Sequence, residues 1–89
     1  MRKSEKKLRE ALAEIEAEYK RATAIYPPFN STHEAYAVLL EEVDEFWDDV
    51  KANRANRVEL IQIGAMVVRS LCELELRRGL TCHEGEAQG

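Results

Sequence analysis

The sequence predicts an all-α fold, in which a three-helix protomer completes a helical bundle by oligomerisation. The 89 residues include only two prolines and four glycines, too few for the many turns of a small all-β fold. Apolar residues, 45% of the chain, recur at helical spacing in three segments. A chain of this length buries only about 60–65% of its unfolded surface, so we expect other subunits to extend the core.

The first helix is expected from about Ser4 to Tyr26. Its apolar positions alternate in steps of four and three, as in helices that pack along a partner helix. They are Leu8, Leu12, Ile15, Tyr19, Ala22 and Tyr26. Pro27 and Pro28 end this helix, because neither has a backbone N–H to donate and the second keeps the first out of helical geometry.

The second helix is expected to begin near His33 and to fray at residues 51–53. Ser31 and Glu34 fit a capping box, in which each side chain bonds a backbone N–H of the other residue. Helical periodicity places seven apolar residues on one face, which we expect to be buried and rich in aromatic rings. They are Tyr36, Leu39, Leu40, Val43, Phe46, Trp47 and Val50.

The third helix is expected to begin near Asn56 and to end at Gly79, with Arg77 and Arg78 in its last turn. Residues 60–68 carry no charge, and a helix that is apolar all round is buried on several sides. Residues 1–79 are therefore predicted to form a single helical domain, and residues 80–89 a C-terminal tail.

The acidic excess of the chain lies in residues 31–50, which contain seven acidic and no basic side chains. A segment of this charge repels phosphates, which argues against a nucleic-acid polymer as partner. No run of apolar residues approaches the ~20 needed to cross a bilayer, and residues 1–20 lack an apolar leader core. Two cysteines form no disulfide framework, so we expect a cytoplasmic protein without a membrane partner.

Three glutamates are candidates for a metal site. Glu42 and Glu45 lie one turn apart at the edge of the apolar face, and Glu59 approaches them if the second and third helices pack antiparallel. Partly buried carboxylates repel one another, and a divalent cation would relieve that repulsion. Oxygen ligands favour Mg²⁺, or Mn²⁺, over Zn²⁺.

Each of these residues also has a structural interpretation. Glu42 and Glu45 are compatible with solvated helix positions, and Glu59 with a capping partner of Asn56. Gln62 lies in the apolar run and needs a partner, since an unbonded buried amide costs about 1–3 kcal/mol. That partner is either another helix or a ligand in the site.

The segment from Pro28 to Leu74 resembles the MazG-like branch of the all-α nucleoside triphosphate pyrophosphohydrolases. The resemblance lies in PFNSTHEAYAVLLEEVDEFWDDVK followed by ELIQIGAMVVR. The family pattern is E-x-x-E on one helix and E-x-x-D on the next, around a shared Mg²⁺ site. Glu42, Glu45 and Glu59 match three of its acidic positions, and Gln62 stands where the family usually has aspartate.

The resemblance implies Mg²⁺-dependent hydrolysis of a (deoxy)nucleoside triphosphate to the monophosphate and pyrophosphate, by a homodimer or homotetramer. Glu42, Glu45 and Glu59 would be catalytic and, with Gln62, would hold the metal. Lys51, Arg54 and His33 are the candidates for substrate binding, with Arg57 as a further phosphate ligand. Two alternatives stay open, namely a non-catalytic helical interaction module and a relative that binds nucleotide without cleaving it.

Overall fold

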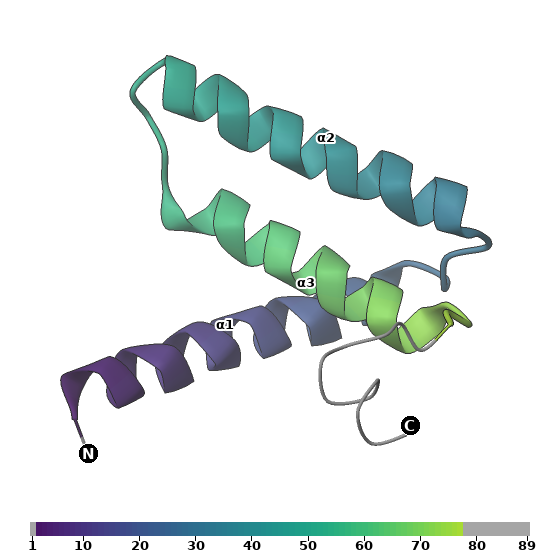
Figure 1. The fold of residues 1–89 in the computed structure, drawn as a ribbon, viewed down its shortest axis with the longest axis horizontal. Helices are drawn as coiled ribbons and strands as arrows, with labels where there is room; N and C mark the ends of the chain where they lie inside the picture. The colour runs from purple at the N-terminus through teal and green to yellow at the C-terminus, as the bar shows by residue number, and fades with distance from the viewer. Residues whose placement is uncertain (1, 78–89) are drawn as a thin grey trace, which may run out of the picture.

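The computed structural model describes residues 2–77, which form three helices. They are α1 (Lys3–Ile25), α2 (Thr32–Lys51) and α3 (Arg57–Glu73). α2 and α3 run antiparallel as a hairpin, and α1 crosses α3 on another side (Figure 1). Within the described residues α3 packs against both other helices, whereas α1 and α2 do not pack against each other. The all-α prediction is confirmed, and α3 is the helix on which the others are assembled.

The helix ends follow the predicted capping signals. Ser31 Oγ accepts a hydrogen bond from the Glu34 N–H at 3.1 Å, while the Glu34 carboxylate accepts from the Asn30 N–H, one residue earlier than in a standard capping box. At the start of α3, Asn56 Oδ1 accepts from the Val58 N–H at 2.9 Å. α1 ends at Ile25, one residue earlier than expected, and Tyr26 links it to the two prolines.

The end of α2 is ordered where fraying was expected. Asn53 adopts a left-handed conformation with φ of 60°, and its N–H bonds Val50 O. The Arg54 N–H bonds Asp49 O at 2.7 Å. These two bonds form a Schellman motif with asparagine in the left-handed position, and they bring Arg54 back against the last turn of α2.

The predicted end of α3 is wrong. The helix stops at Glu73, and Leu74 is extended (φ −101°, ψ 144°) and packs against the core. Arg77 therefore lies beyond the helix, while Arg78, Gly79 and the predicted 80–89 tail lie outside the described residues. Glu73, the last residue of α3, holds the α1–α2 connection, because its carboxylate accepts the Phe29 N–H at 3.0 Å.

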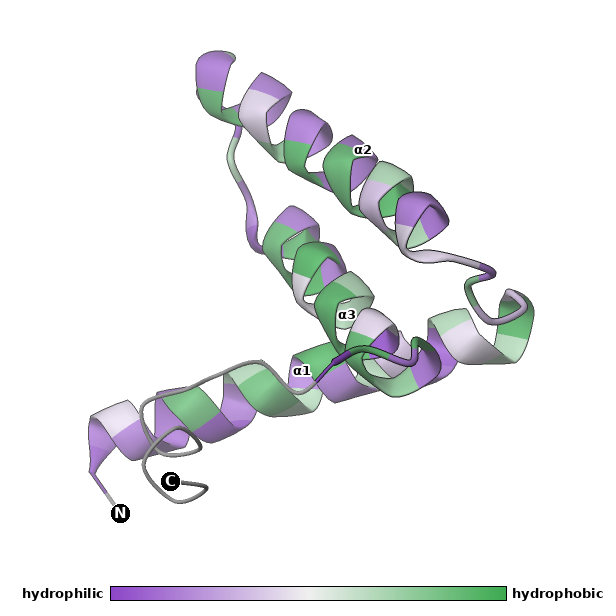
Figure 2. Ribbon diagram, turned by 45° about the vertical axis from the view of Figure 1, so that its right-hand side comes forward, coloured by the Kyte–Doolittle hydropathy of each residue, from purple (hydrophilic) through white to green (hydrophobic). Residues whose placement is uncertain are grey.

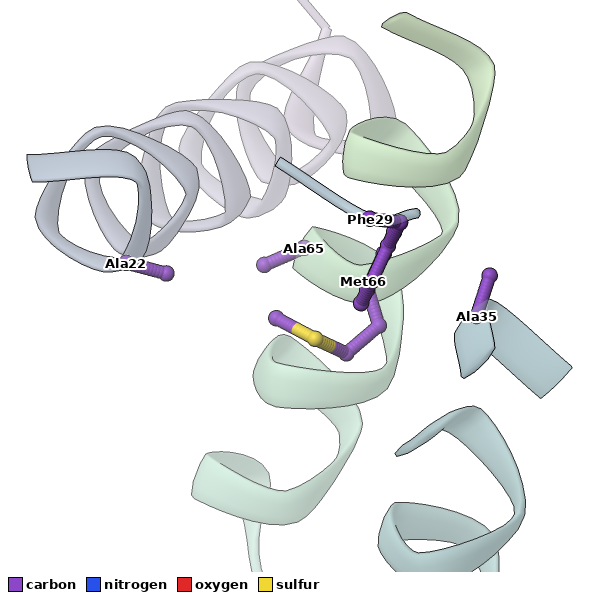
Figure 3. Close-up of a cluster of buried hydrophobic side chains, with 5 residues drawn as sticks. All are labelled: Ala22, Phe29, Ala35, Ala65 and Met66. Carbon is purple, nitrogen blue, oxygen red and sulfur yellow. The ribbon is translucent and has the colours of Figure 1, made fainter. Parts of the chain in front are cut away.

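The core is small and gathers around the middle of α3. Ala65 and Met66 of α3 meet Ala22 of α1, Ala35 of α2 and Phe29 of the connection between them (Figure 3). Four of these five residues, three alanines and a methionine, have small or flexible side chains. The helices therefore approach closely, and little apolar volume is enclosed. None of the described helices combines the length and the apolar character that crossing a membrane requires.

Most of the predicted apolar face of α2 is exposed within the described residues, contrary to the prediction, although Leu39 and Phe46 of that face are half-buried. Tyr36 is 65% and Trp47 55% exposed, and Leu40, Val43 and Val50 are also exposed. The N-terminal half of α1 extends past α3 (Figures 1 and 2). It does not cover the exposed residues of α2, and its own Leu8 and Leu12 are also exposed. The cause is the rotation of α2 about its axis, which turns toward the core only one edge of the apolar face, with Leu39, together with the flank that carries Glu42.

The crossing of α1 and α3 leaves little room at Gly64. A Cβ there would lie 2.8 Å from Ile15 Cδ1, so the larger side chain of Gly64→Leu must force the two helices apart or displace the Ile15 side chain. We expect a loss of about 1–3 kcal/mol in the free energy of unfolding, measured by urea denaturation. The control Val67→Leu, at an exposed position of α3, should change it little. Equal stability of both variants would contradict this crossing.

Candidate functional site

Glu42, Glu45 and Glu59 form a cluster between α2 and α3. One carboxylate oxygen of each lies within 4.8 Å of one from each of the others. Glu42 and Glu45 are three residues apart and so lie on one flank of α2, while Glu59 is in the first turn of α3. The antiparallel hairpin brings these two ends together, which confirms the predicted convergence of the three side chains.

The cluster is partly buried and lacks internal compensation. Glu42 Oε2 and Glu59 Oε2 are fully buried with no hydrogen-bond partner among the described residues. Burial raises the pKa of Glu42, and the charges of Glu45 and Glu59 raise it further. Burial likewise raises the pKa of Glu59, followed by the charges of Glu45 and Asp49. Among the described residues, no basic side chain forms an ion pair with Glu42, Glu45 or Glu59, so their negative charge is concentrated there.

Asp49 is a member of this electrostatic environment that the sequence interpretation missed. It lies four residues after Glu45, so helical periodicity places it on the same flank of α2. Arg54 approaches Asp49 at 3.6 Å, held there by the Schellman turn. Arg54 is therefore the predicted substrate-binding residue that lies at the edge of the cluster.

The other predicted phosphate-binding cations point elsewhere. Lys51 pairs with Asp48 at 3.4 Å and lies over the Trp47 ring, 5.5 Å from its centre. Arg57 pairs with Glu14 of α1. Both cations therefore have carboxylate partners away from the cluster, since Asp48 lies on the outer side of α2 and Glu14 lies on another helix.

His33 is also separated from the cluster. It is exposed in the first turn of α2, nine residues before Glu42, which corresponds to about 13.5 Å along the helix axis. A direct role beside the carboxylates does not fit this position, because an imidazole cannot span that distance.

A cavity of about 390 Å³ opens beside the cluster, where α1, α2 and α3 meet. Glu42 and Gln62 line it on the side of the cluster, and Val38 and Met66 provide apolar walls. Phe29 and Arg69 line it near the α1–α2 connection. Gln62 is only partly buried, so its amide has access to the cavity and to the side of α3 that carries Glu59.

The residues of the cluster suit a hard divalent cation. Carboxylate oxygens are the donors that Mg²⁺ and Mn²⁺ prefer, and two of these oxygens are buried without a donor. Glu42, Glu45 and Glu59 would hold such an ion, with the Gln62 amide oxygen as an additional ligand from α3. Acidic clusters also occur on protein surfaces without metals, so the burial of the two oxygens is the relevant distinction.

Comparison with known proteins identifies no relative: no family model, no curated protein and no solved structure matches this chain.

The repulsion within the cluster predicts a pH-dependent stability. Because folding raises the Glu42 pKa, its ionisation destabilises the fold, and that destabilisation grows as pH rises from the ordinary glutamate value through the raised one. Without divalent cations, Glu42→Gln should melt a few degrees above the wild type at pH 7, where ~1 kcal/mol corresponds to ~4–8 °C.

The difference should close as the pH falls toward about 4, where the wild-type carboxyl is protonated. Asp44→Asn, which removes a charge from the exposed side of the same helix, serves as the control and should show no such pH-dependent gap. A wild type more stable than Glu42→Gln at pH 7 without cations would contradict the repulsion. Melting curves by circular dichroism supply the measurement.

Proposed function

We propose that the protein is a Mg²⁺-dependent nucleoside triphosphate pyrophosphohydrolase, which cleaves a (deoxy)nucleoside triphosphate into the monophosphate and pyrophosphate. The observation that carries this proposal is the convergence of Glu42, Glu45 and Glu59 with two buried, unpartnered carboxylate oxygens. The resemblance to the MazG-like family through these same residues supports it. The adjoining cavity is of the size found in small-molecule sites.

The carboxylates have separable roles in this proposal. Mg²⁺, or Mn²⁺, when bound would neutralise phosphate oxygens and polarise the phosphorus that is attacked. Glu42 and Glu59, whose buried oxygens lack partners, are the main candidates to hold the ion. Glu45 is exposed, so it can also reach solvent and orient or deprotonate the attacking water.

Polar groups around the cluster would bind the substrate. Arg54 lies at its edge and carries a planar guanidinium suited to phosphate oxygens. Gln62 lines both the cavity and the cluster side of α3, and its amide can donate to substrate as well as ligate the ion. Lys51 would have to leave Asp48 to reach a phosphate, which makes Arg54 the better candidate.

We further propose that the chain works as a homo-oligomer through the exposed apolar faces of α2 and α3. Tyr36, Leu40, Val43, Trp47 and Val50 of α2 and Leu60, Val67 and Leu71 of α3 are all exposed. Helical periodicity places both sets on the side opposite the cavity. Each side chain exposes on the order of 100 Å², and together they approach the ~800 Å² per partner of a stable interface.

The same exposed faces favour one competing function, a non-catalytic helical interaction module. In that case the apolar surface would bind a different protein, and the acidic cluster would be a solvated or arginine-binding surface. The two functions differ in whether the cluster binds a divalent cation and whether a triphosphate is cleaved.

Incubation with each (d)NTP and Mg²⁺ should yield nucleoside monophosphate and pyrophosphate, resolved by anion-exchange chromatography. Glu45→Gln should lower turnover at least about 100-fold, as expected for loss of a general base.

Mg²⁺ should raise the wild-type melting temperature, since an ion at 100 times its Kd adds about 2.7 kcal/mol to stability. Asp44→Asn serves as the matched control and should keep both properties.

Release of diphosphate and orthophosphate instead would contradict cleavage at the α–β bond. Absence of both product and melting shift, with Mg²⁺ and with Mn²⁺, would favour the interaction module.

Light scattering after size exclusion should give a mass that is a multiple of the 10.2 kDa protomer. Leu40→Lys/Trp47→Lys should shift the protein toward the monomer, because two ammonium groups cannot be buried in an apolar interface without a large desolvation cost. Ala37→Lys, exposed on the same helix outside the apolar stripe, should leave the mass unchanged. A wild-type monomer at high micromolar concentration would overturn self-association.

A further inference from the structure

Arg69 gives the cavity a buried, positively charged wall. The residue is only 3% exposed and lies on α3, two turns beyond Gln62. Seven residues of helix correspond to about 10.5 Å, so Gln62 and Arg69 line opposite ends of the cavity. The acidic cluster adjoins the first end, and the α1–α2 connection adjoins the second.

Most of the Arg69 guanidinium is committed to holding this connection. Nε donates to Glu73 Oε2 at 3.2 Å, and Nη2 donates to Glu73 Oε1 and to the Pro27 carbonyl at 3.1 Å. Glu73 accepts the Phe29 N–H in turn, and the guanidinium lies over the Phe29 ring, 4.2 Å from its centre. The group is therefore rigidly placed.

The remaining nitrogen, Nη1, contacts only a weak acceptor among the described residues. Its partner is Met66 Sδ at 3.9 Å, and a thioether accepts hydrogen bonds poorly. Nη1 carries two N–H groups, and both Arg69 and Met66 line the cavity, so beside the cavity a charged donor has no oxygen acceptor among residues 2–77. A ligand that offers a carbonyl oxygen there would supply it.

We infer that Arg69 selects nucleotides whose base carries a carbonyl at the edge far from the sugar, namely 4-oxopyrimidines and 6-oxopurines. This inference rests on the proposed function, because phosphates bound at the acidic cluster direct the base along the cavity toward Arg69. The far edge of the base is then the part that reaches the guanidinium. A 4-amino or 6-amino group at that edge would set one donor against another and leave both unpaired.

Two substrate pairs test this inference, since each differs mainly at the group that Arg69 would contact. We expect kcat/KM for dUTP to exceed that for dCTP, and kcat/KM for dITP to exceed that for dATP, in at least one pair by about tenfold or more. Arg69→Met should bring these ratios close to one. Because each ratio is taken within one variant, a general loss of folded protein does not change it.

Arg21→Met is the matched control, because Arg21 also lines the cavity but is engaged with Glu18 at 2.9 Å. It should keep the wild-type ratios. If Arg69→Met does not fold, as judged by circular dichroism, Arg69→Lys replaces it, since lysine keeps the charge but loses the fork and should reduce the ratios. Wild-type ratios near one, or ratios unchanged in both Arg69 variants, would overturn the inference.

Calorimetry with non-hydrolysable α,β-imido analogues of the same four nucleotides separates this inference from the proposed function. Preferential binding of the oxo-base analogues without cleavage of any triphosphate would support the role of Arg69 and overturn the hydrolase. Cleavage of all four at equal efficiency would overturn the role of Arg69 alone. Failure of every analogue to bind in the presence of Mg²⁺ would overturn both.

Discussion

The rotation of α2 about its own axis is the constraint from which the rest of this structure follows. α2 turns Glu42 toward α3 and leaves Tyr36 and Trp47 exposed. For an isolated chain this is an unfavourable choice, because burial of apolar area contributes about 25 cal/mol per Å² whereas carboxylates brought together repel. Under the proposed function, a cation would satisfy the carboxylates and a second subunit would cover the aromatic rings.

α3 supports α1 on one side and the acidic cluster and cavity on another. Its Ala65 and Gly64 are small enough for α1 to approach on one side, and Glu59 and Gln62 face the cluster and cavity on another. Two polar contacts link its ends to the α1 side of the molecule, an ion pair of Arg57 with Glu14 and a hydrogen bond that Arg69 donates to the Pro27 carbonyl. The cavity therefore has walls from three helices, although α1 and α2 do not pack together.

The sequence was sufficient to predict the three helices, the N-terminal caps of α2 and α3, and the convergence of the three glutamates, because these depend on local periodicity and on one short antiparallel connection. It did not reveal which side of α2 faces α3. The amphipathic pattern identifies an apolar face, but within one chain it cannot say whether that face is covered by α3 or by another molecule. The end of α3 was also missed, because it too depends on a contact with a distant part of the chain. Glu73, the last helical residue, accepts the Phe29 N–H of the α1–α2 connection.

The environment of Arg69 is set by long-range contacts that the local sequence does not show. In the sequence, Arg69 directly follows the uncharged run of residues 60–68, and nothing local marks it as a buried residue. In the fold it is almost fully buried and paired with Glu73 and the Pro27 carbonyl. A buried ion pair is often no more stabilising than apolar side chains of the same volume, so overall stability is a weak reason for an arginine here. Its network instead positions the α1–α2 connection and keeps a charged donor at the cavity wall, which apolar packing could not provide.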